Sequence, residues 1–345
     1  MDTLFRPTTL RPLTLKNRIV RSATNEHLSE SDGQLTQVWA DTLIELARNE
    51  VGLIISGHFC VDASQRADKG QPVLNADTSE ALLRCAADGV HRYGGKLLLQ
   101  LSHSGIKAME RINSIPPKHP EDFTLSELDA LVDAFVLAAK RCQDCGVDGV
   151  QIHTAHGYLL SNFLNPVENL RTDEYGGDLE NRYRLIARIL SAVRGACGSG
   201  FAVLVKADCN GCGDLPTLLR LYARSGVDGI EVSGTEFNCH AGQRSPFYLD
   251  ELLRARGTLS TPLILVGGIF SRQTAEDVLR HGIRLVSFSR ALICEPAFAA
   301  KLKSGVQEES RCRACNACYT IYRSRFVRCV QHTEKIPQLE KVFGR

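Results

Sequence analysis

The stretch AVLVKADCNGCGDLPTLLRLYARSGVDGIEVS, residues 202–233, contains one complete repeat of the fold. It begins with a short apolar, β-branched segment at Ala202–Ala207 and ends with another at Gly229–Ser233. Between them lies an amphipathic segment at Leu215–Ser225. Short apolar runs are typical of strands buried on both faces, and an amphipathic run is typical of a covering helix. The order strand, helix, strand therefore predicts two parallel strands joined by a helical crossover.

The same alternation runs through most of the chain. We predict eight strands, at Arg18–Ala23, Gly52–Ser56, Lys96–Leu101, Gly149–His153, Ala202–Ala207, Gly229–Ser233, Leu263–Val266 and Leu285–Ser289. Predicted helices lie at Val38–Arg48, Ser79–Tyr93, Leu125–Cys145, Asn181–Cys197, Leu215–Ser225 and Gln273–His281, with Asp77 and Ser271 as expected N-caps. Eight such strands favour a single-domain α/β fold, the TIM (β/α)8 barrel, over an open doubly wound sheet. The absence of a G-x-G-x-x-G turn after the first strand supports this choice.

The composition is that of a globular protein with a sizeable core. The chain has 345 residues, 43% hydrophobic and 23% charged, and a formal net charge of +2, which gives no overall attraction to nucleic acid or acidic membranes. No apolar run approaches the ~18 residues of a membrane span, and the N-terminus shows no secretory signal. The 13 cysteines, an odd number, favour a reducing compartment. We expect a cytoplasmic protein with a small-molecule substrate and no nucleic-acid or membrane partner, and leave open whether it forms a homo-oligomer.

The most informative motif is VQIHTAHGYLLSNFLNPVENLRTDEYGGDLENR, at Val150–Arg182. It leaves the fourth predicted strand with His153, His156 and Tyr158, at the barrel end where active sites lie. Two neutral imidazoles can donate hydrogen bonds to a carbonyl oxygen and polarise an enone, and a nearby tyrosine can supply a proton. Metal ligation and ordinary loop roles are the alternatives for this pair of histidines.

A phosphate site is expected after the last two strands. The pair Gly267-Gly268 follows strand seven, and Ser289-Arg290 follows strand eight. Glycines let backbone N–H groups approach a phosphate, and the loops after strands seven and eight commonly bind phosphate in barrels. This pattern indicates a phosphate group without identifying the molecule that carries it.

Together with NRIVRSAT (17–24), LLLQLSHSG (97–105) and LVGGIFS (265–271), the Val150–Arg182 motif closely resembles the Old Yellow Enzyme family of FMN-dependent NAD(P)H:flavin oxidoreductases. The resemblance extends over about residues 4–305. It implies that FMN is the cofactor and NAD(P)H the reductant. It also implies hydride transfer from flavin N5 to an activated C=C bond, in an α,β-unsaturated carbonyl compound or an enoyl or dienoyl thioester.

The resemblance implies roles for individual residues. His153 and His156 would anchor the substrate oxygen, and Tyr158 would donate the proton. The implied cofactor-binding residues are Ser22, Ala23, Thr24, Asn25, Gly57, Gln100, Lys206, Gly267, Gly268, Ser289 and Arg290. Two of them depart from the family pattern. Asn25 stands where Thr or Cys is usual, and Lys206 stands where many members have Arg, so the cation near flavin N1 would be a point charge.

From about residue 306 the composition changes, and we expect residues 1–305 to form the barrel and residues 306–345 a Cys-rich extension packed on it. Cys312, Cys315, Cys318 and Cys329 form C-x2-C-x2-C-x10-C, which could ligate a [4Fe–4S] cluster or zinc, or could be buried thiols. The pattern resembles the cluster site of the dienoyl-CoA reductase and trimethylamine dehydrogenase group, where the cluster passes electrons to an FAD domain. These 345 residues leave no room for such a domain, so a cluster here would need an external electron-transfer partner or would be structural.

Three rival functions stay open. The first is an amine dehydrogenase or demethylase on the same scaffold. The second is a flavin and iron–sulfur electron-transfer subunit that works only with a partner. The third is a flavin-free lyase or isomerase that uses the phosphate site for its substrate. The sequence does not distinguish NADH from NADPH.

Overall fold

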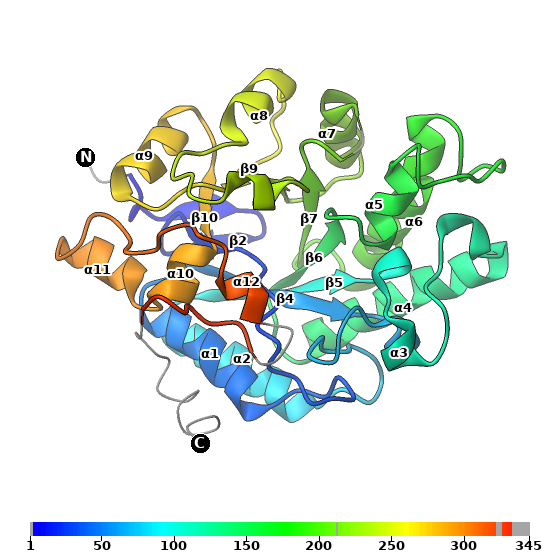
Figure 1. Cartoon of the computed structure of the whole chain (residues 1–345), viewed down its shortest axis with the longest axis horizontal. Helices are drawn as coiled ribbons and strands as arrows, with labels where there is room; N and C mark the ends of the chain where they lie inside the picture. The colour runs from blue at the N-terminus through cyan, green and yellow to red at the C-terminus, as the bar shows by residue number, and fades with distance from the viewer. Residues whose placement is uncertain (1–2, 212, 322–325, 333–345) are drawn as a thin grey trace.

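The computed structural model describes residues 3–211, 213–321 and 326–332. Within these ranges eight parallel strands close into a barrel in the order β10-β3-β4-β5-β6-β7-β8-β9 (Figure 1). The barrel strands are β3 (Ile19–Arg21), β4 (Leu53–Cys60), β5 (Lys96–Ser102), β6 (Gly149–Thr154), β7 (Ala202–Asp208), β8 (Gly229–Ser233), β9 (Leu263–Val266) and β10 (Leu285–Phe288). Each predicted strand overlaps one of them, so the TIM-barrel prediction is confirmed.

Helices surround the barrel in the alternation that the sequence predicts. The longer ones are α1 (Gln37–Arg48), α2 (Glu80–Arg92), α4 (Leu125–Asp144), α6 (Leu179–Cys197), α7 (Leu215–Arg224) and α9 (Arg272–Arg280). Shorter helices are α3 (Glu110–Asn113), α5 (Leu159–Leu164), α8 (Leu249–Ala255), α10 (Arg290–Cys294), α11 (Phe298–Ser304) and α12 (Cys318–Ile321). Among the described residues, no helix combines the length and apolarity that a membrane span requires.

One of the two expected helix caps is wrong. Ser271 caps α9, because its Oγ accepts from Thr274 N at 3.1 Å. Asp77 does not cap α2: its backbone N donates to Asn75 Oδ1 at 2.9 Å within a turn, and the cap is Ser79. Aspartate is a favoured residue type at an N-cap, which is why Asp77 was predicted. It lies two residues before the true cap, and the chain makes one more turn before the helix begins.

An N-terminal hairpin that the sequence did not reveal precedes the barrel. Strands β1 (Thr8–Leu10) and β2 (Leu13–Leu15) pair antiparallel, and their leucines pack into one apolar cluster with barrel residues such as Val20, Leu98 and Leu285. Barrel strands alternate inward and outward side chains, and this cluster fills the interior below the functional end. The opposite, C-terminal end of the barrel is left for polar side chains.

Strand β4 is longer than predicted because it contains a bulge. Its pairing with β5 shifts register between Ile55 and His58, and the strand continues to Cys60. A bulge re-aims the side chains that follow it, and bulges are frequent beside active sites. His58, two residues beyond the predicted end of this strand, therefore lies within β4.

The described part of the C-terminal extension packs onto the barrel through a buried carboxylate. Glu295 is the residue directly after α10, and it has no exposed surface. Its carboxylate accepts hydrogen bonds from Gln307, Ser310 and Arg311. The extension continues to α12, which lies beside α10 in Figure 1. The boundary expected at residue 306 stays a prediction, and residues after 306 reach the mouth of the barrel.

Candidate active site

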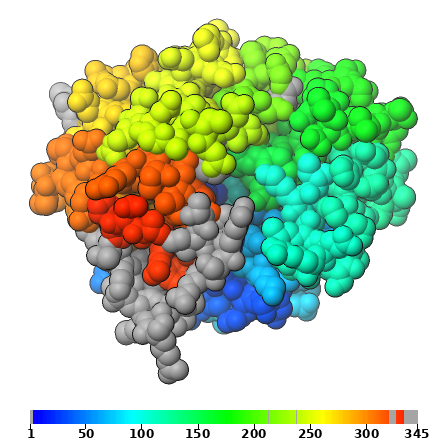
Figure 2. Space-filling view, viewed as in Figure 1, coloured from blue at the N-terminus to red at the C-terminus, as the bar shows by residue number. Residues whose placement is uncertain are grey.

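A cavity of about 870 Å³ opens at the C-terminal ends of the barrel strands. Figure 2 shows a hollow in this face, between the orange and red segments near the C-terminus and the cyan segments. The predicted residues in its wall are Ser22, Ala23, Thr24, Asn25, Gln100, His153, His156, Tyr158, Lys206, Gly267, Gly268, Ser289 and Arg290. Ligand pockets commonly measure roughly 300–1,000 Å³. The space is therefore sufficient for a bound cofactor with room for a small substrate.

Gly57, also predicted to bind the cofactor, lies behind this wall. A Cβ at this position would come within 2.6 Å of the backbone oxygen of Thr24 and 2.9 Å of Asn25 Cα. The close approach of two backbone segments accounts for the glycine. Gly57 does not line the cavity, so its contact with a cofactor stays a prediction.

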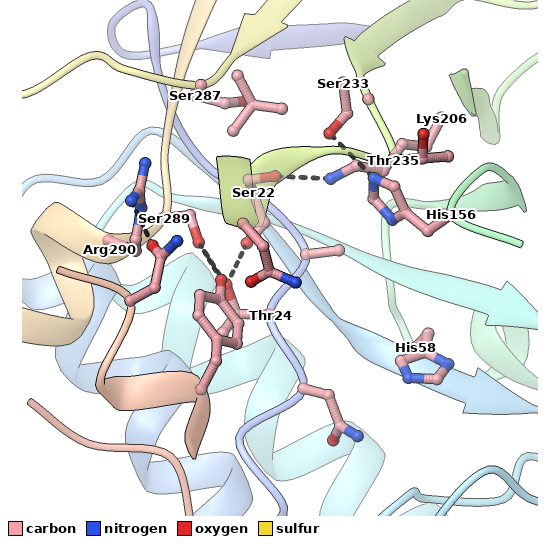
Figure 3. A pocket seen from close by; sticks show the side chains of 18 of the residues that line it. Ser22, Thr24, His58, His156, Lys206, Ser233, Thr235, Ser287, Ser289 and Arg290 are labelled. Atoms are coloured by element: carbon pink, nitrogen blue, oxygen red, sulfur yellow. Dashed lines mark hydrogen bonds between the residues drawn. The ribbon is translucent and has the colours of Figure 1, made fainter. Parts of the chain in front are cut away.

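A buried charge network crosses the floor of the cavity. Lys206 Nζ donates to Ser22 Oγ at 2.8 Å (Figure 3). It also lies 3.3 Å from Glu231 Oε2. The same carboxyl accepts from Gln151 Nε2 at 3.0 Å, and Gln151 Oε1 accepts from Gln100 Nε2 at 2.7 Å. Burial acts to raise the pKa of Glu231, but the Lys206 charge and the hydrogen bonds outweigh it and lower this pKa. Lys206 is therefore paired with a carboxylate, a partner that the sequence interpretation missed.

His153 offers a hydrogen-bonding atom to the cavity. Its side chain is 2% exposed, and Nδ1 has no partner within the described residues. Burial, together with the neighbouring His156 and His58, lowers the pKa of His153 well below its usual value. A neutral imidazole with an unpaired buried nitrogen is suited to bind a ligand, because leaving such an atom unpaired is unfavourable.

His156 is held in an unusual backbone conformation beside His153. Its φ is +64°, in the left-handed region, and its backbone N donates to Asp208 Oδ2 at 2.6 Å. Its Nε2 lies 3.0 Å from Ser233 Oγ (Figure 3). Its ring centroid is 5.1 Å from that of His153. Burial, followed by the charges of Lys206 and Lys107, lowers the pKa of His156 well below its usual value. The structure thus brings the two predicted histidines together as neutral groups.

Asp208, at the end of β7, is a functional candidate that the sequence interpretation missed. Burial raises its pKa to about 7, although the hydrogen bond from His156 and the charges of Lys206 and Lys107 act in the opposite direction. Its free oxygen, Oδ1, lies 3.6 Å from His156 Nε2. Strongly shifted pKa values are frequent at functional sites. The only signal in the sequence was a charged residue at the end of an apolar strand.

Tyr158 completes the group at the cavity wall. Its ring centroid is 5.0 Å from that of His153, and Lys107 Nζ lies 4.9 Å from the ring centroid of Tyr158. Its Oη lies 3.3 Å from His58 Nε2. The three residues predicted to act on the substrate therefore share one wall of the cavity, with His58 as an unpredicted fourth member.

At the end of the cavity where a phosphate is predicted to bind, the wall is formed by residues of both the barrel and the C-terminal extension. Arg290 Nη1 donates to Ala314 O at 3.1 Å and to Asn316 Oδ1 at 2.5 Å. Ser289 Oγ lies 3.2 Å from Thr24 Oγ1 and 3.3 Å from the hydroxyl of Tyr319. Cys315, Asn316 and Tyr319 also line the cavity. The extension therefore forms part of the wall at this end, which the sequence interpretation did not anticipate.

Gly267 and Gly268 are required by the backbone around them. Their φ angles are +115° and +73°, and a Cβ on Gly268 would lie 1.6 Å from Ser245 O. The side chain of Asn25 is also engaged: Nδ2 donates to Asp68 Oδ2 at 3.1 Å, and Oδ1 accepts from His27 N at 3.2 Å. Contact of these residues with FMN remains a prediction.

The four cysteines of the extension line a second, smaller cavity beside the first, and Cys315 lines both. A fifth thiol, Cys294 of α10, contacts Cys312 and Cys329 and was missed because it precedes the motif. Within the described ranges, no three or more His, Cys, Asp or Glu side chains are arranged to hold a metal ion. The donor chemistry of the four thiols fits an iron–sulfur cluster, which stays a prediction.

Comparison with known proteins identifies the family. Residues 3–208 match the model of the NADH:flavin oxidoreductase / NADH oxidase family. The chain is 32% identical to an NADPH dehydrogenase of Geobacillus sp. over 85% of its length and 91% of the relative. It is 28% identical to an NADH oxidase of Thermoanaerobacter brockii over 91% of its length, but it spans only 52% of that relative. The structure of an old yellow enzyme homologue from Zymomonas mobilis, 23% identical, has the same fold, with a TM-score of 0.77 over 89% of this chain and 94% of that one. The chain therefore belongs to the NADH:flavin oxidoreductase / NADH oxidase family, as its resemblance to Old Yellow Enzyme predicted, and is an NAD(P)H:flavin oxidoreductase.

Proposed function

We propose that this chain uses NAD(P)H and FMN to reduce an activated C=C bond in an α,β-unsaturated carbonyl compound or an enoyl or dienoyl thioester. The observation that carries the proposal is the arrangement of His153, His156 and Tyr158. A buried and a partly buried imidazole, both neutral, share one wall with a phenol in a cavity large enough for a cofactor and a substrate.

The described residues fit FMN at both ends of the cavity. Lys206 and Gln100 would hold the pyrimidine edge, and Gly267, Gly268 and Arg290 would hold the phosphate. Bound FMN would supply a hydride from N5. The Glu231 carboxylate, 3.3 Å from Lys206 Nζ, offsets the lysine charge and would hold Lys206 in place at this end of the cavity. Protein groups near N1 tune flavin chemistry in this way.

The substrate oxygen would accept hydrogen bonds from the histidine pair. His153 Nδ1 lacks a partner in the described part of the chain, so a bound carbonyl would satisfy it when Nδ1 carries the proton. Because both histidines stay neutral, they can stabilise negative charge on this oxygen without first forming an ion pair in the resting enzyme. Tyr158 Oη would then give its proton to the carbon next to the carbonyl.

A second candidate function is an electron-transfer subunit with a [4Fe–4S] cluster on Cys312, Cys315, Cys318 and Cys329. Cys315 favours it, because this residue lines both the main cavity and the cysteine-lined cavity. The Thermoanaerobacter brockii relative, about twice as long as this chain, is consistent with a further domain or partner. Such a protein would exchange electrons with a partner rather than turn over NAD(P)H and an enone alone.

The test is analysis of anaerobically purified protein, followed by turnover. We expect about one FMN per chain and oxidation of NADH or NADPH that depends on 2-cyclohexenone. Replacing His153 with alanine should lower the rate of enone reduction by about 10²–10³-fold, the usual effect of removing one donor to a developing oxyanion. Protein that binds FMN but reduces no enone would contradict the proposal.

Further outcomes separate the alternatives. Oxidation of secondary or tertiary amines in place of enone reduction would favour the amine dehydrogenase. About four irons and four sulfides per chain, with turnover only when a partner chain is added, would favour the electron-transfer subunit. Protein that cannot be reconstituted with FMN would favour the flavin-free barrel enzyme.

A further inference from the structure

A third histidine, His58, lies in the same cavity wall, beside Tyr158 and 6.0 Å from His153 between ring centroids. His58 is on β4, directly after the bulge, and is 7% exposed (Figure 3). Its ring centroid lies 4.7 Å from that of Tyr158, with the two planes at 62°. Its Nε2 lies 3.3 Å from Tyr158 Oη, and its Nδ1 lies 2.8 Å from Gln71 Nε2. Both ring nitrogens therefore have a polar neighbour.

The hydrogen bonds of Gln71 determine which nitrogen of His58 carries the proton. Gln71 is fully buried, and its Oε1 accepts from Ala67 N at 2.6 Å and from Ser104 Oγ at 3.2 Å. A backbone N–H can only donate, so the atom facing Ala67 must be the amide oxygen. The amide nitrogen then faces His58 and can only donate, so Nδ1 must accept. The proton of the neutral ring is thereby placed on Nε2, where it points to Tyr158 Oη.

The ring stays neutral in this position. Burial lowers the pKa of His58 to about 4, against the opposing charge of Asp68, with smaller contributions from His27 and Lys107 in the same direction as burial. The titratable groups that face it are therefore Asp68 and His27 on the neighbouring loops, Lys107, Tyr158, and His153 on β6, whose ring centroid is 6.0 Å away. A neutral His58 can donate one hydrogen bond to Tyr158 and accept none from it.

We propose that His58 is a positioning residue that acts through Tyr158: Gln71 fixes its Nε2–H tautomer, and Nε2–H stabilises the Tyr158 oxygen after that oxygen has given up its proton. This rests on the proposed function, in which Tyr158 is the proton donor. In that step the Tyr158 O–H bond breaks, and the electron pair of the substrate enolate forms a new C–H bond. The phenolate oxygen keeps the O–H electron pair and accepts from His58, until a solvent proton restores the phenol.

The arrangement explains why a neutral imidazole suits this position. An imidazole in the other tautomer would accept from the phenol and hold its proton in place. The Nε2–H tautomer favours the deprotonated oxygen instead, because hydrogen bonds to charged groups are stronger than those between neutral groups. Lys107 Nζ, 4.9 Å from the Tyr158 ring centroid, adds favourable charge from another side.

Nitrogen NMR of the FMN-loaded protein with labelled histidine tests the tautomer directly. The His58 signals are assigned by their loss in His58→Gln, with His281→Gln, on the exposed end of α9, as the matched control. We expect a neutral His58 with the proton on Nε2 at about pH 7. A proton on Nδ1, or a charged ring, would overturn the proposal.

Substitution then tests the effect on Tyr158. His58→Phe keeps an aromatic ring against Tyr158 but removes the donor, whereas His58→Gln keeps a donor. The pH midpoint of Tyr158 ionisation is read from the tyrosinate absorbance of each protein minus that of its Tyr158→Phe counterpart. In His58→Phe we expect this midpoint to rise by about one unit and the single-turnover rate of substrate protonation to fall about tenfold. His58→Gln should recover at least half of both effects.

The outcomes separate this inference from the proposed function. An unchanged Tyr158 midpoint in a folded, FMN-loaded His58→Phe protein refutes the role of His58, whatever the enzyme reduces. An enzyme that reduces no enone refutes the proposed function, while the NMR and absorbance measurements still decide the contact. If His58→Phe does not fold, Gln71→Met removes the group that fixes the tautomer and should raise the same midpoint.

Discussion

Replacing Glu295 with glutamine should loosen the C-terminal extension from the barrel. The Glu295 carboxyl has no exposed surface. Oε1 accepts from Gln307 Nε2 at 2.9 Å and Arg311 Nε at 3.0 Å, and lies 3.3 Å from Lys301 Nζ. Oε2 accepts from Ser310 Oγ at 2.8 Å and Arg311 N at 2.6 Å. A glutamine of the same shape keeps one acceptor, but its amide N–H groups would face donors.

The magnitude follows from the ionisation of Glu295. Burial acts to raise its pKa, but the hydrogen bonds from Gln307, Arg311 and Ser310 outweigh burial and lower the pKa from 4.5 to about 2. Each pKa unit corresponds to ~1.4 kcal/mol, so the ionised carboxylate contributes about 3 kcal/mol to the free energy of unfolding. Because the folded-state pKa is lowered, this contribution is complete above the unfolded pKa and is lost as the pH falls toward about 2.

Urea unfolding at about pH 7 and about pH 3 provides the assay. We expect Glu295→Gln to be about 3 kcal/mol less stable near neutrality, and the difference from the unmodified protein to shrink at the lower pH. Glu309→Gln is the matched control, since Glu309 pairs with Arg244 at 2.7 Å with 63% of its side chain exposed. Such a surface pair contributes at most about 1 kcal/mol. An equal stability difference at both pH values would refute the assignment of the effect to the Glu295 charge.

Three further predictions concern the cavity. Lys206→Met leaves the Glu231 carboxylate buried without its partner, so urea unfolding should show that the free energy of unfolding falls by about 3–5 kcal/mol. Gel filtration should show that the variant no longer retains FMN. Lys206→Arg should restore both the stability and the FMN. The Asp208 pKa of about 7 lies above its ordinary value of 3.8, so the free energy of unfolding should decrease as the pH rises between these values. Unfolding curves of Asp208→Asn, measured over the same pH range, should lack this decrease. Gly268→Ala would place Cβ 1.6 Å from a backbone oxygen and should abolish FMN retention, whereas Gly177→Ala, with φ +82° but open space around it, should only lower the melting temperature by a few degrees.

The barrel was predictable because its signal is local and repeated. Each predicted strand is a short apolar run, such as Leu263–Val266, and each lies between amphipathic segments. The β1–β2 hairpin was missed because each strand is three residues long, too short for a periodic pattern. The bulge in β4 was missed because it depends on pairing with β5, which the sequence of β4 alone does not contain.

The sequence predicted the main residues of the candidate site, but not the residues that they contact. The motif around His153 placed the histidine pair and Tyr158 in one cavity with Lys206, as the structure has them. Their partners are separated from them in sequence by tens of residues and carry no motif of their own. One signal was nevertheless present: Lys206 and Glu231 are charged residues inside two neighbouring apolar strands. Since buried charges are almost always paired, their opposite signs already favoured a direct ion pair.

The contacts of the extension imply that its folding and the filling of the cavity are coupled. Arg290, which begins α10, hydrogen-bonds Asn316, and Val327 N donates to Glu26 O at 2.9 Å. Both Asn316 and Val327 also line the cavity. A ligand that touches these residues binds only the state in which the extension is docked, so it stabilises that state by mass action. By the same linkage, loosening the extension at Glu295 must weaken the affinity for such a ligand, even though Glu295 does not line the cavity.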